Sequence, residues 1–91
     1  MAVAVNSLAG IPDASFAAEL RAYVDAGRRP GPFLTSLLSN DLRGAVAVAD
    51  PDNRGRIADW IEFCDGHLPM ASWGSAAIVE NWLFRRSRGE L

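Results

Sequence analysis

Glycine and proline interrupt this chain at short intervals, and the segments between them carry apolar residues at helical spacing. In none of these segments do apolar and polar residues alternate cleanly, as they would in a half-buried strand. The sequence therefore predicts an all-α protein. Because 91 residues support only one hydrophobic core, we expect a single domain, 1–91, folded as a compact orthogonal bundle of about five short helices. Residues 1–10 are expected to be flexible and residues 87–91 to form a tail.

The predicted helices begin and end at residues that are typical of helix termini. Proline stands in the first turn of three of them, and the capping residues Asp50 and Ser75 each precede one. Gly27 and Gly66 are placed to end helices, and Asn40 is expected both to end one helix and to cap the next. The predicted ranges are 12–26, 32–39, 41–49, 51–65 and 76–86.

Each predicted helix has an apolar face that we expect to be buried. Gly44 weakens the third helix by about 1 kcal/mol relative to alanine, and it lets another helix approach closely. Asp52 and Arg56 are four residues apart and are expected to pair on the fourth helix. The predicted core residues are Phe16, Leu20, Tyr23, Val24, Phe33, Leu34, Leu37, Leu38, Leu42, Ala45, Val46, Ala49, Ile57, Trp60, Ile61, Cys64, Ile78, Val79, Trp82 and Leu83.

Composition excludes several classes of function. A net charge of −2 argues against nucleic-acid binding, since such proteins neutralise many phosphates. A lone cysteine rules out an intramolecular disulfide and a multi-cysteine zinc site. The sequence has no metal or cofactor motif, so neither group is predicted. It also has no signal peptide and no run of about 20 apolar residues, so we expect a cytoplasmic protein without membrane contact.

The sequence contains few residues that could form a catalytic site. Cys64 and His67 are three residues apart and form the only candidate for a nucleophile and its base. The alternative places Cys64 in the apolar core and His67 in the last helical turn, where it suits the helix dipole. Asp50 and Asp52 lack the glycine and distal glutamate of a calcium loop, and helix capping explains them. We therefore predict no catalytic residue and no enzyme.

Polar and aromatic residues at the predicted corners are the candidates for binding. Arg28 and Arg29 precede a Pro-Gly-Pro turn at a helix start, where they could hold a phosphate or a partner's carboxylate. In the alternative they are solvated, with Arg29 paired to Asp25. The full set of candidate binding residues is Arg28, Arg29, Asn40, Asp41, Arg43, Trp73 and Ser75.

The other candidates also have structural alternatives. Trp73 stands directly before a helix start, where its ring and the free backbone N–H groups could hold a planar or anionic ligand. The alternative is a buried anchor for the loop. Asn40 and Asp41 could likewise serve only as a helix junction that satisfies backbone groups.

A set of spaced residues between Tyr23 and Leu83 points to a family. The set comprises Pro30-Gly31-x-Phe33-Leu34, Asn40-Asp41-Leu42, Ala49-Asp50, Asn53, Ile61-x-Phe63, Pro69, Trp73-Gly74-Ser75, Val79 and Trp82-Leu83. This pattern resembles small helical proteins encoded by phages and prophages, a group with no assigned activity. The resemblance implies a phage or prophage origin and a setting in the host cytoplasm, and it transfers no catalytic residue.

Two functions follow as hypotheses. The leading one is a non-enzymatic protein that occupies or sequesters a host factor, either a host protein or a small nucleotide-like anion; a role against host defence is consistent with the resemblance. The alternative is a helix-turn-helix-like regulator, with segments 41–49 and 51–65 as the helix pair and Arg54 and Arg56 on phosphates. About half of the chain is apolar, so we also expect self-association, most simply as a homodimer.

Overall fold

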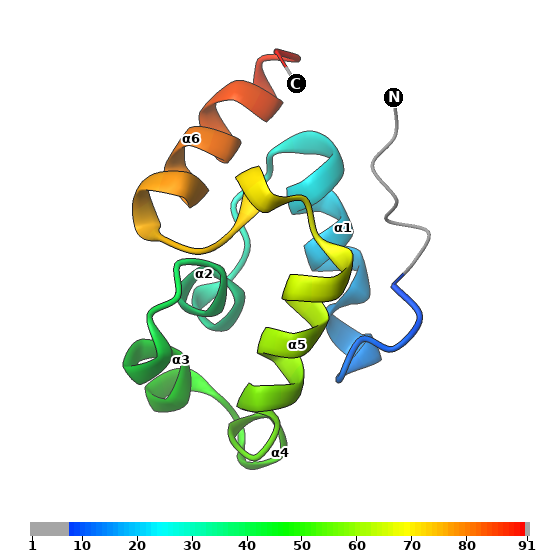
Figure 1. Cartoon of the computed structure of the whole chain (residues 1–91), viewed down its shortest axis with the longest axis vertical. Helices are drawn as coiled ribbons and strands as arrows, with labels where there is room; N and C mark the ends of the chain where they lie inside the picture. Colours follow the sequence, from blue (N-terminus) through cyan, green and yellow to red (C-terminus); the bar gives the residue numbers. More distant parts are fainter. Residues whose placement is uncertain (1–7, 91) are drawn as a thin grey trace.

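The computed structural model describes residues 8–90, and this part of the chain contains helices and no strand (Figure 1). The predicted all-α fold is confirmed. The elements are the 3-10 turn η2 (Ala14–Phe16), the α-helices α1 (Ala17–Ala26), α2 (Pro32–Leu38), α3 (Leu42–Val48), α4 (Pro51–Arg54) and α5 (Ile57–His67), the 3-10 turn η3 (Met70–Ser72) and α6 (Ala76–Ser87). Of the segment 1–10 that we expected to be flexible, residues 1–7 lie outside the described part, and Leu8 is buried. Ser87, expected in the tail, is the last residue of α6.

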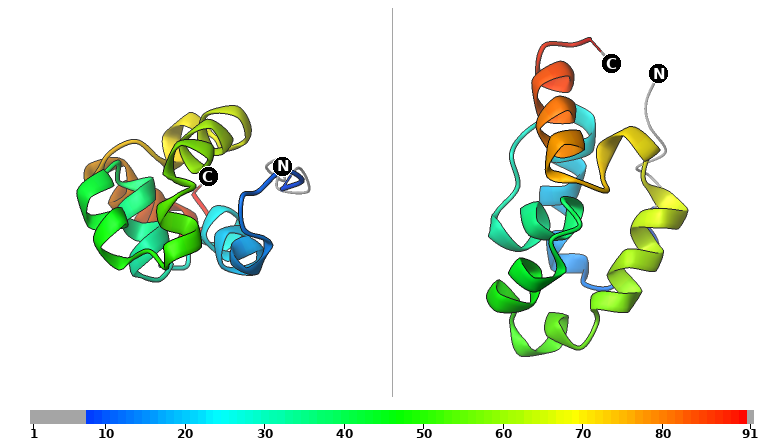
Figure 2. Two further views of the ribbon diagram at one scale, coloured as in Figure 1. Left: turned by 90° about the horizontal axis from the view of Figure 1, so that it is seen from below. Right: turned by 60° about the vertical axis from the view of Figure 1, so that its left-hand side comes forward.

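Helix α2 lies between α6 and α3 along the long axis of the molecule (Figures 1 and 2). It contacts α3, α5 and α6, and its four apolar side chains are all buried, as predicted. Helix α6 packs against α1 at one end of the long axis, and α4 lies at the opposite end (Figure 1). The molecule measures 36 × 25 × 18 Å along its principal axes.

One core joins these helices. The predictions for Trp60, Trp82 and Cys64 are confirmed, because all three are buried in it. Two polar residues, Asn53 and Ser72, are also buried. The buried apolar residues are Leu8, Leu20, Tyr23, Val24, Phe33, Leu34, Leu37, Leu38, Ala45, Ala49, Trp60, Phe63, Cys64, Leu68, Val79, Trp82 and Leu83.

Side-chain caps begin three of the helices. Asp50 and Ser75 each accept a hydrogen bond from the backbone N–H three residues later, at 2.8 and 3.1 Å, as predicted. The cap of α3 is Asp41, which accepts from Gly44 N at 3.0 Å. The prediction that Asn40 caps this helix is therefore wrong. Asn40 has φ 59° and belongs to the turn after α2, a left-handed conformation that asparagine tolerates better than most residues.

The predicted first helix begins later than expected. Asp13 caps η2 and accepts from Ser15 N at 3.0 Å, and the α-helix starts only at Ala17. The other carboxylate oxygen of Asp13 accepts from the Asn53 side chain at 2.8 Å. This contact joins residues 40 positions apart, so helix periodicity in the sequence could not reveal it.

The predicted helix 51–65 is broken. It ends at Arg54 and resumes at Ile57, so that α4 and α5 are separate helices. A hydrogen bond from Trp60 Nε1 to Asn53 Oδ1, which measures 2.9 Å, spans the break. In a continuous helix these residues would lie about 10 Å apart along the axis, and the break brings them together. The predicted pair between Asp52 and Arg56 is not formed, because Arg56 donates to Pro12 O at 3.0 Å instead.

Three predicted core residues are exposed. Leu42 and Val46 of α3 are 43% and 39% exposed, and Ile78 of α6 is 36% exposed. Within α3 only Ala45 is buried. Gly44 faces α2 closely, since a Cβ on Gly44 would lie 3.1 Å from the Ser36 side chain, which confirms the predicted close approach of another helix. Helix α3 thus meets α2 through small residues, and its large apolar side chains remain at the surface.

Candidate functional site

The predicted binding residues fall into separate groups. Trp73 and Ser75 flank Gly74, whose N–H donates to Leu38 O at 2.7 Å. This bond places the loop against the C-terminal end of α2, two residues before Asn40. The loop and the Asn40-Asp41 corner are therefore neighbours in space. Arg43 is exposed on α3.

The arginine pair follows α1. Arg29 forms a bidentate ion pair with Glu80 of α6, with N–O distances of 2.9 and 2.6 Å. The predicted pairing of Arg29 with Asp25 is therefore wrong. The hydrogen bonds from Arg29 hold the pKa of Glu80 below its ordinary value. Glu80 occupies the guanidinium fork of Arg29. Of these two arginines, Arg28 is the one that is exposed without a side-chain partner among the described residues.

Two lowered carboxyl pKa values predict how stability depends on pH. Glu80 is held ionised by Arg29, and hydrogen bonds from Ser15 and Asn53 lower the pKa of Asp13. Both groups stabilise the fold above their unfolded pKa values, and this contribution is lost as the pH falls through their folded values. We expect the free energy of unfolding to decline below about pH 5.

Urea unfolding between neutral pH and about pH 3 measures this decline. Glu80→Gln should make the dependence on pH shallower. Asp25→Asn is the matched control, because Asp25 is exposed and makes no side-chain ion pair among the described residues. Identical pH profiles for wild type and Glu80→Gln would contradict the prediction.

The corner residues serve the backbone. The carboxylate of Asp41 and the hydroxyl of Ser75 accept the capping hydrogen bonds of α3 and α6. Trp73 is half-buried and packs against the core, as expected for a loop anchor. These contacts match the structural alternative for each residue, and they leave only part of each side chain to meet a partner.

Cys64 and His67 do not form a nucleophile and base. Cys64 is 1% exposed, and burial raises the pKa of its thiol to about 12, so almost no thiolate exists at neutral pH. His67 is exposed, and its Nδ1 lies 3.2 Å from Phe63 O. Because a carbonyl oxygen only accepts, Nδ1 is the donor. The thiol is therefore inside the core and the imidazole outside it.

The carboxylates likewise form no evident cation site. Asp50 accepts three hydrogen bonds from the backbone and side chain of Asn53, which accounts for its position. Within residues 8–90, no group of three or more His, Cys, Asp or Glu side chains could hold a metal ion.

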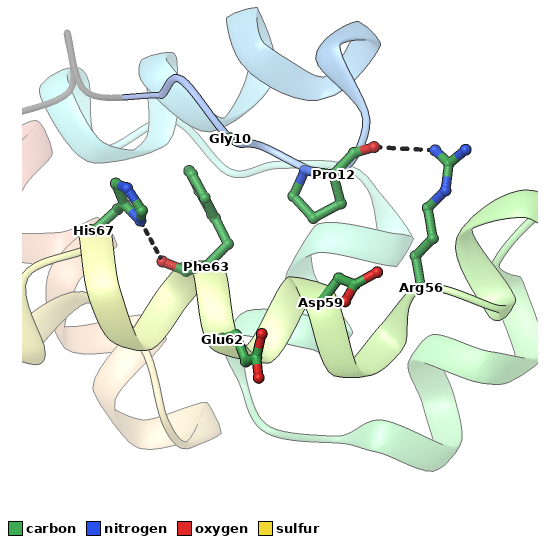
Figure 3. Close-up of a pocket in the computed structure, with 7 residues that line it drawn as sticks. All are labelled: Gly10, Pro12, Arg56, Asp59, Glu62, Phe63 and His67. Atoms are coloured by element: carbon green, nitrogen blue, oxygen red, sulfur yellow. Dashed lines mark hydrogen bonds between the residues drawn. The ribbon is translucent and has the colours of Figure 1, made fainter.

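One hollow in the described structure was not anticipated from the sequence. It is a groove of about 630 Å³ between the N-terminal segment and α5 (Figure 3). The lining residues are Gly10, Pro12, Arg56, Asp59, Glu62, Phe63 and His67. The volume lies within the range of small-ligand sites. We refer to this hollow below as the α5 groove.

The walls of the α5 groove differ in chemistry. The rings of Phe63 and His67 project from successive turns of α5 toward the segment that contains Pro12 (Figure 3), and they stack with centroids 4.6 Å apart and planes 15° apart. Arg56 closes one end by donating to Pro12 O at 3.0 Å. Asp59 and Glu62 add two carboxylates from the same helix. The helical spacing of the α5 residues was visible in the sequence, but the opposite wall comes from a segment more than 40 residues earlier.

Another hollow, of about 330 Å³, surrounds the ion pair of Arg29 and Glu80. Leu83 and Phe84 of α6 contribute its apolar wall. Because the two charges already satisfy each other, this hollow offers little unpaired charge to a ligand.

The chain matches no protein-family model, and no curated protein or solved structure is significantly similar to it. Among the described residues, no helix has the length and apolar character needed to cross a lipid bilayer. Any function of this chain is therefore inferred from its own residues.

Proposed function

We propose that this chain is a non-enzymatic binding protein of the phage or prophage type that occupies or sequesters a host protein in the bacterial cytoplasm. Interference with a host defence protein is one form of this role. The observation that carries the proposal is the exposed apolar face of α3. The sequence pattern of small phage proteins supports the setting, and the buried, protonated thiol of Cys64 supports a role without covalent chemistry.

Helix α3 has large apolar side chains at the surface. Leu42, Val46 and Val48 are 43%, 39% and 50% exposed, and they are three of the six large hydrophobic residues exposed between residues 8 and 90. Leu42 and Val46 are one turn apart and share a face of α3, whereas Val48 lies on another side of the helix. Apolar side chains grouped at a surface, as Leu42 and Val46 are, are typical of protein interaction sites. Arg43 and Asp41 add charged groups beside them, as in the polar rim of an interface.

A protein partner suits this surface better than a nucleotide-like anion. An anion needs unpaired donors, and the fork of Arg29 is occupied by Glu80. Trp73 packs against the core, which removes part of its ring from a ligand. The same apolar face could also meet a second copy of the chain, so a homodimer through α3 is the competing use of this surface.

We expect the double variant Leu42→Glu/Val46→Glu to lose its host partner, because two buried charges would oppose desolvation of the interface. Tagged wild type should retain the partner from host lysate, and the variant should retain at least about tenfold less. The matched control is Ala18→Glu, which adds a charge to an exposed position of α1. Helix α1 lies on the other side of the molecule from α3 (Figure 2).

Native mass spectrometry of the captured material separates the outcomes. Circular dichroism first establishes that all three proteins are folded. Equal capture by wild type and the double variant would remove α3 from the proposal, and recovery of wild type only as a free monomer would overturn sequestration itself. A dimer of wild type that becomes monomeric in the double variant would assign the face to self-association.

A helix-turn-helix regulator remains the alternative, with less support. Its proposed second helix is interrupted between Arg54 and Ile57. Arg54 donates to Ala49 O at 3.2 Å, and Arg56 donates to Pro12 O at 3.0 Å. Both arginines thus make contacts within the fold. Binding to DNA that weakens steeply with added salt would favour this alternative.

A further inference from the structure

We propose that the C-terminal ends of α1 and α6 together bind an acidic segment of a partner protein that presents an apolar side chain. We call this surface the arginine end and define it as residues 25–29 and 80–90. The apolar face proposed above belongs to α3, so this inference does not depend on that proposal. It is carried by the charge of the arginine end, by the guanidinium groups that the fold leaves available there, and by an exposed phenylalanine beside a hollow.

The arginine end forms because α6 docks on the end of α1 (Figure 1). A Cβ on Gly27 would lie 2.5 Å from Ser87 N, and Arg86 Nε donates to Asp25 O at 2.9 Å. Two segments that are more than 50 residues apart in sequence thus become one surface.

This end of the molecule is positive although the chain as a whole is negative. Its side chains comprise five arginines and three carboxylates, a net charge of +2, and the remaining four arginines and eight carboxylates of the chain sum to −4. The arginines are Arg28, Arg29, Arg85, Arg86 and Arg88, and the carboxylates are those of Asp25, Glu80 and Glu90. An acidic segment is therefore attracted to the arginine end and repelled by the rest of the surface, which orients its approach.

The ion pairs within the arginine end leave positive charge unmatched. Glu90 is shared by two arginines, since its carboxylate lies 3.9 Å from Arg85 Nε and 2.8 Å from Arg88 Nε. One carboxylate therefore offsets only one of these two charges. Arg28 is exposed and has no side-chain partner among the described residues, so its charge is also available to a partner.

The ends of both helices are closed by backbone hydrogen bonds. At the end of α6, Gly89 N donates to Arg86 O at 3.0 Å and Glu90 N donates to Arg85 O at 2.9 Å. Gly27 N closes the end of α1 in the same way. The exposed guanidinium groups are therefore not needed to cap these helix ends.

The apolar part of the surface is Phe84, which is 59% exposed on α6. Phe84 and Leu83 form the apolar wall of the 330 Å³ hollow, which Gly27 also lines. The guanidinium of Arg88 lies over the Phe84 ring, 4.9 Å from its centroid. Aromatic residues and arginine are both enriched at protein interfaces. An apolar side chain in the hollow would thus place a neighbouring carboxylate beside Arg88.

A nucleic acid fits the arginine end less well. Its affinity depends on neutralising many phosphates, whereas the excess here is two positive charges on an otherwise acidic chain. The carboxylates of Glu80 and Glu90 would also face the phosphates. A short acidic segment of a protein needs only two charge pairs and one apolar contact.

The test is a titration of the ¹⁵N-labelled full chain at about 50 mM salt, with peptide up to about 10 mM. The probe is the peptide acetyl-Glu-Glu-Leu-Glu-Glu-amide, and its uncharged counterpart has Gln in place of each Glu. The acidic peptide should shift the backbone amides of Gly27, Arg28, Phe84 and Arg88 in a saturable way. The Gln peptide should bind at least about tenfold more weakly, because it lacks the charge-assisted hydrogen bonds.

Variants locate the site, after circular dichroism has established that each is folded. Arg28→Glu should weaken binding of the acidic peptide at least about tenfold. Arg21→Glu is the matched control: it reverses a charge at an exposed position of α1 about two turns before Arg28 and should weaken binding less than about threefold. Phe84→Gln should remove the preference for the acidic peptide over a variant peptide with Ser in place of Leu.

Several results would overturn the proposal. They are equal binding of the acidic and Gln peptides, equal losses in Arg28→Glu and Arg21→Glu, no preference of the wild type for Leu over Ser, shifts confined to other helices, or no binding at all. A thymidine oligonucleotide of equal charge that binds more tightly than the acidic peptide would overturn it in favour of a nucleic-acid site. Because none of these measurements involves α3, their failure leaves the capture experiment on Leu42 and Val46 unaffected, and the reverse also holds.

Discussion

Asn53→Ala is expected to lower the free energy of unfolding by roughly 3 kcal/mol. Asn53 is 1% exposed, and its side-chain oxygen accepts from Trp60 Nε1 at 2.9 Å. Its side-chain nitrogen donates to Asp13 at 2.8 Å and to Asp50 at 3.2 Å. One amide thus joins the turn before α1, the cap of α4 and the indole at the centre of the core.

The size of this effect follows from what alanine leaves behind. Trp60 is fully buried, so its N–H would lose its only partner without reaching water, and an orphaned buried donor costs about 1–3 kcal/mol. The two carboxylates can turn to solvent, but the hydrogen bond between Asn53 and Asp13, which ties α4 to the N-terminal turn, would be lost. For a domain of this size the total stability is about 5–15 kcal/mol, so a large fraction is at risk.

Urea unfolding followed by tryptophan fluorescence measures the change. Asn81→Ala is the matched control, since Asn81 is exposed on α6 and should change stability by less than about 0.5 kcal/mol. Asn53→Asp keeps an acceptor for Trp60 but places a third carboxylate beside Asp13 and Asp50, so it should also destabilise. A loss below about 1 kcal/mol in Asn53→Ala would show that the hydrogen bonds of the Asn53 side chain contribute little to stability.

Gly27→Ala is expected to lower the free energy of unfolding by about 2–4 kcal/mol. Gly27 ends α1 with φ 68°, a left-handed conformation that costs a non-glycine residue about 1 kcal/mol. A Cβ at this position would also lie 2.5 Å from Ser87 N on α6. That atom belongs to the backbone, so it cannot turn away as a flexible side chain would.

The clash matters because α6 is docked on the end of α1. Trp82 Nε1 donates to Tyr23 O at 3.1 Å, and Arg86 Nε donates to Asp25 O at 2.9 Å. Moving α6 away from Gly27 would strain both bonds and open the core beside Trp82. The effect should therefore exceed the penalty of the dihedral angle alone.

Two other glycines separate these contributions. Gly10→Ala changes a glycine with φ 94° and no neighbour within 4 Å, so it reports the dihedral penalty without a clash. Gly66→Ala changes a glycine inside α5 with open space around it and should be neutral or stabilise the helix by up to about 1 kcal/mol. If Gly27→Ala and Gly10→Ala lose the same amount, close packing of α6 against α1 contributes nothing.

Local signals in the sequence anticipated much of the fold. The caps Asp50 and Ser75, the terminator Gly27 and the buried face of α2 act within a few residues of one another, so their chemistry can be read along the chain. The exposure of Leu42 and Val46 could not be predicted from the sequence. Apolar spacing shows which side chains share a face of α3, but it does not show whether another element covers that face.

The candidate binding residues show the same limit. Arginine at position 29 was recognisable as a residue that grips a carboxylate, but its partner is Glu80, more than 50 residues away. The α5 groove is a second example. Its lining includes Asp59, Glu62 and His67 only because the segment around Pro12 forms the opposite wall. Local residue spacing predicts neither the contact of Arg29 with Glu80 nor the position of the segment around Pro12.

The amino-acid order alone determined the all-helical class, most helix termini and the identity of the central aromatic residues, because backbone capping and apolar periodicity depend on neighbours within about one or two turns. Only the tertiary structure decided the break before α5, the surface left on α3 and the walls of the groove. Exposure and groove walls depend on how segments distant in sequence pack, and contacts such as the hydrogen bond between Asn53 and Asp13 join such segments.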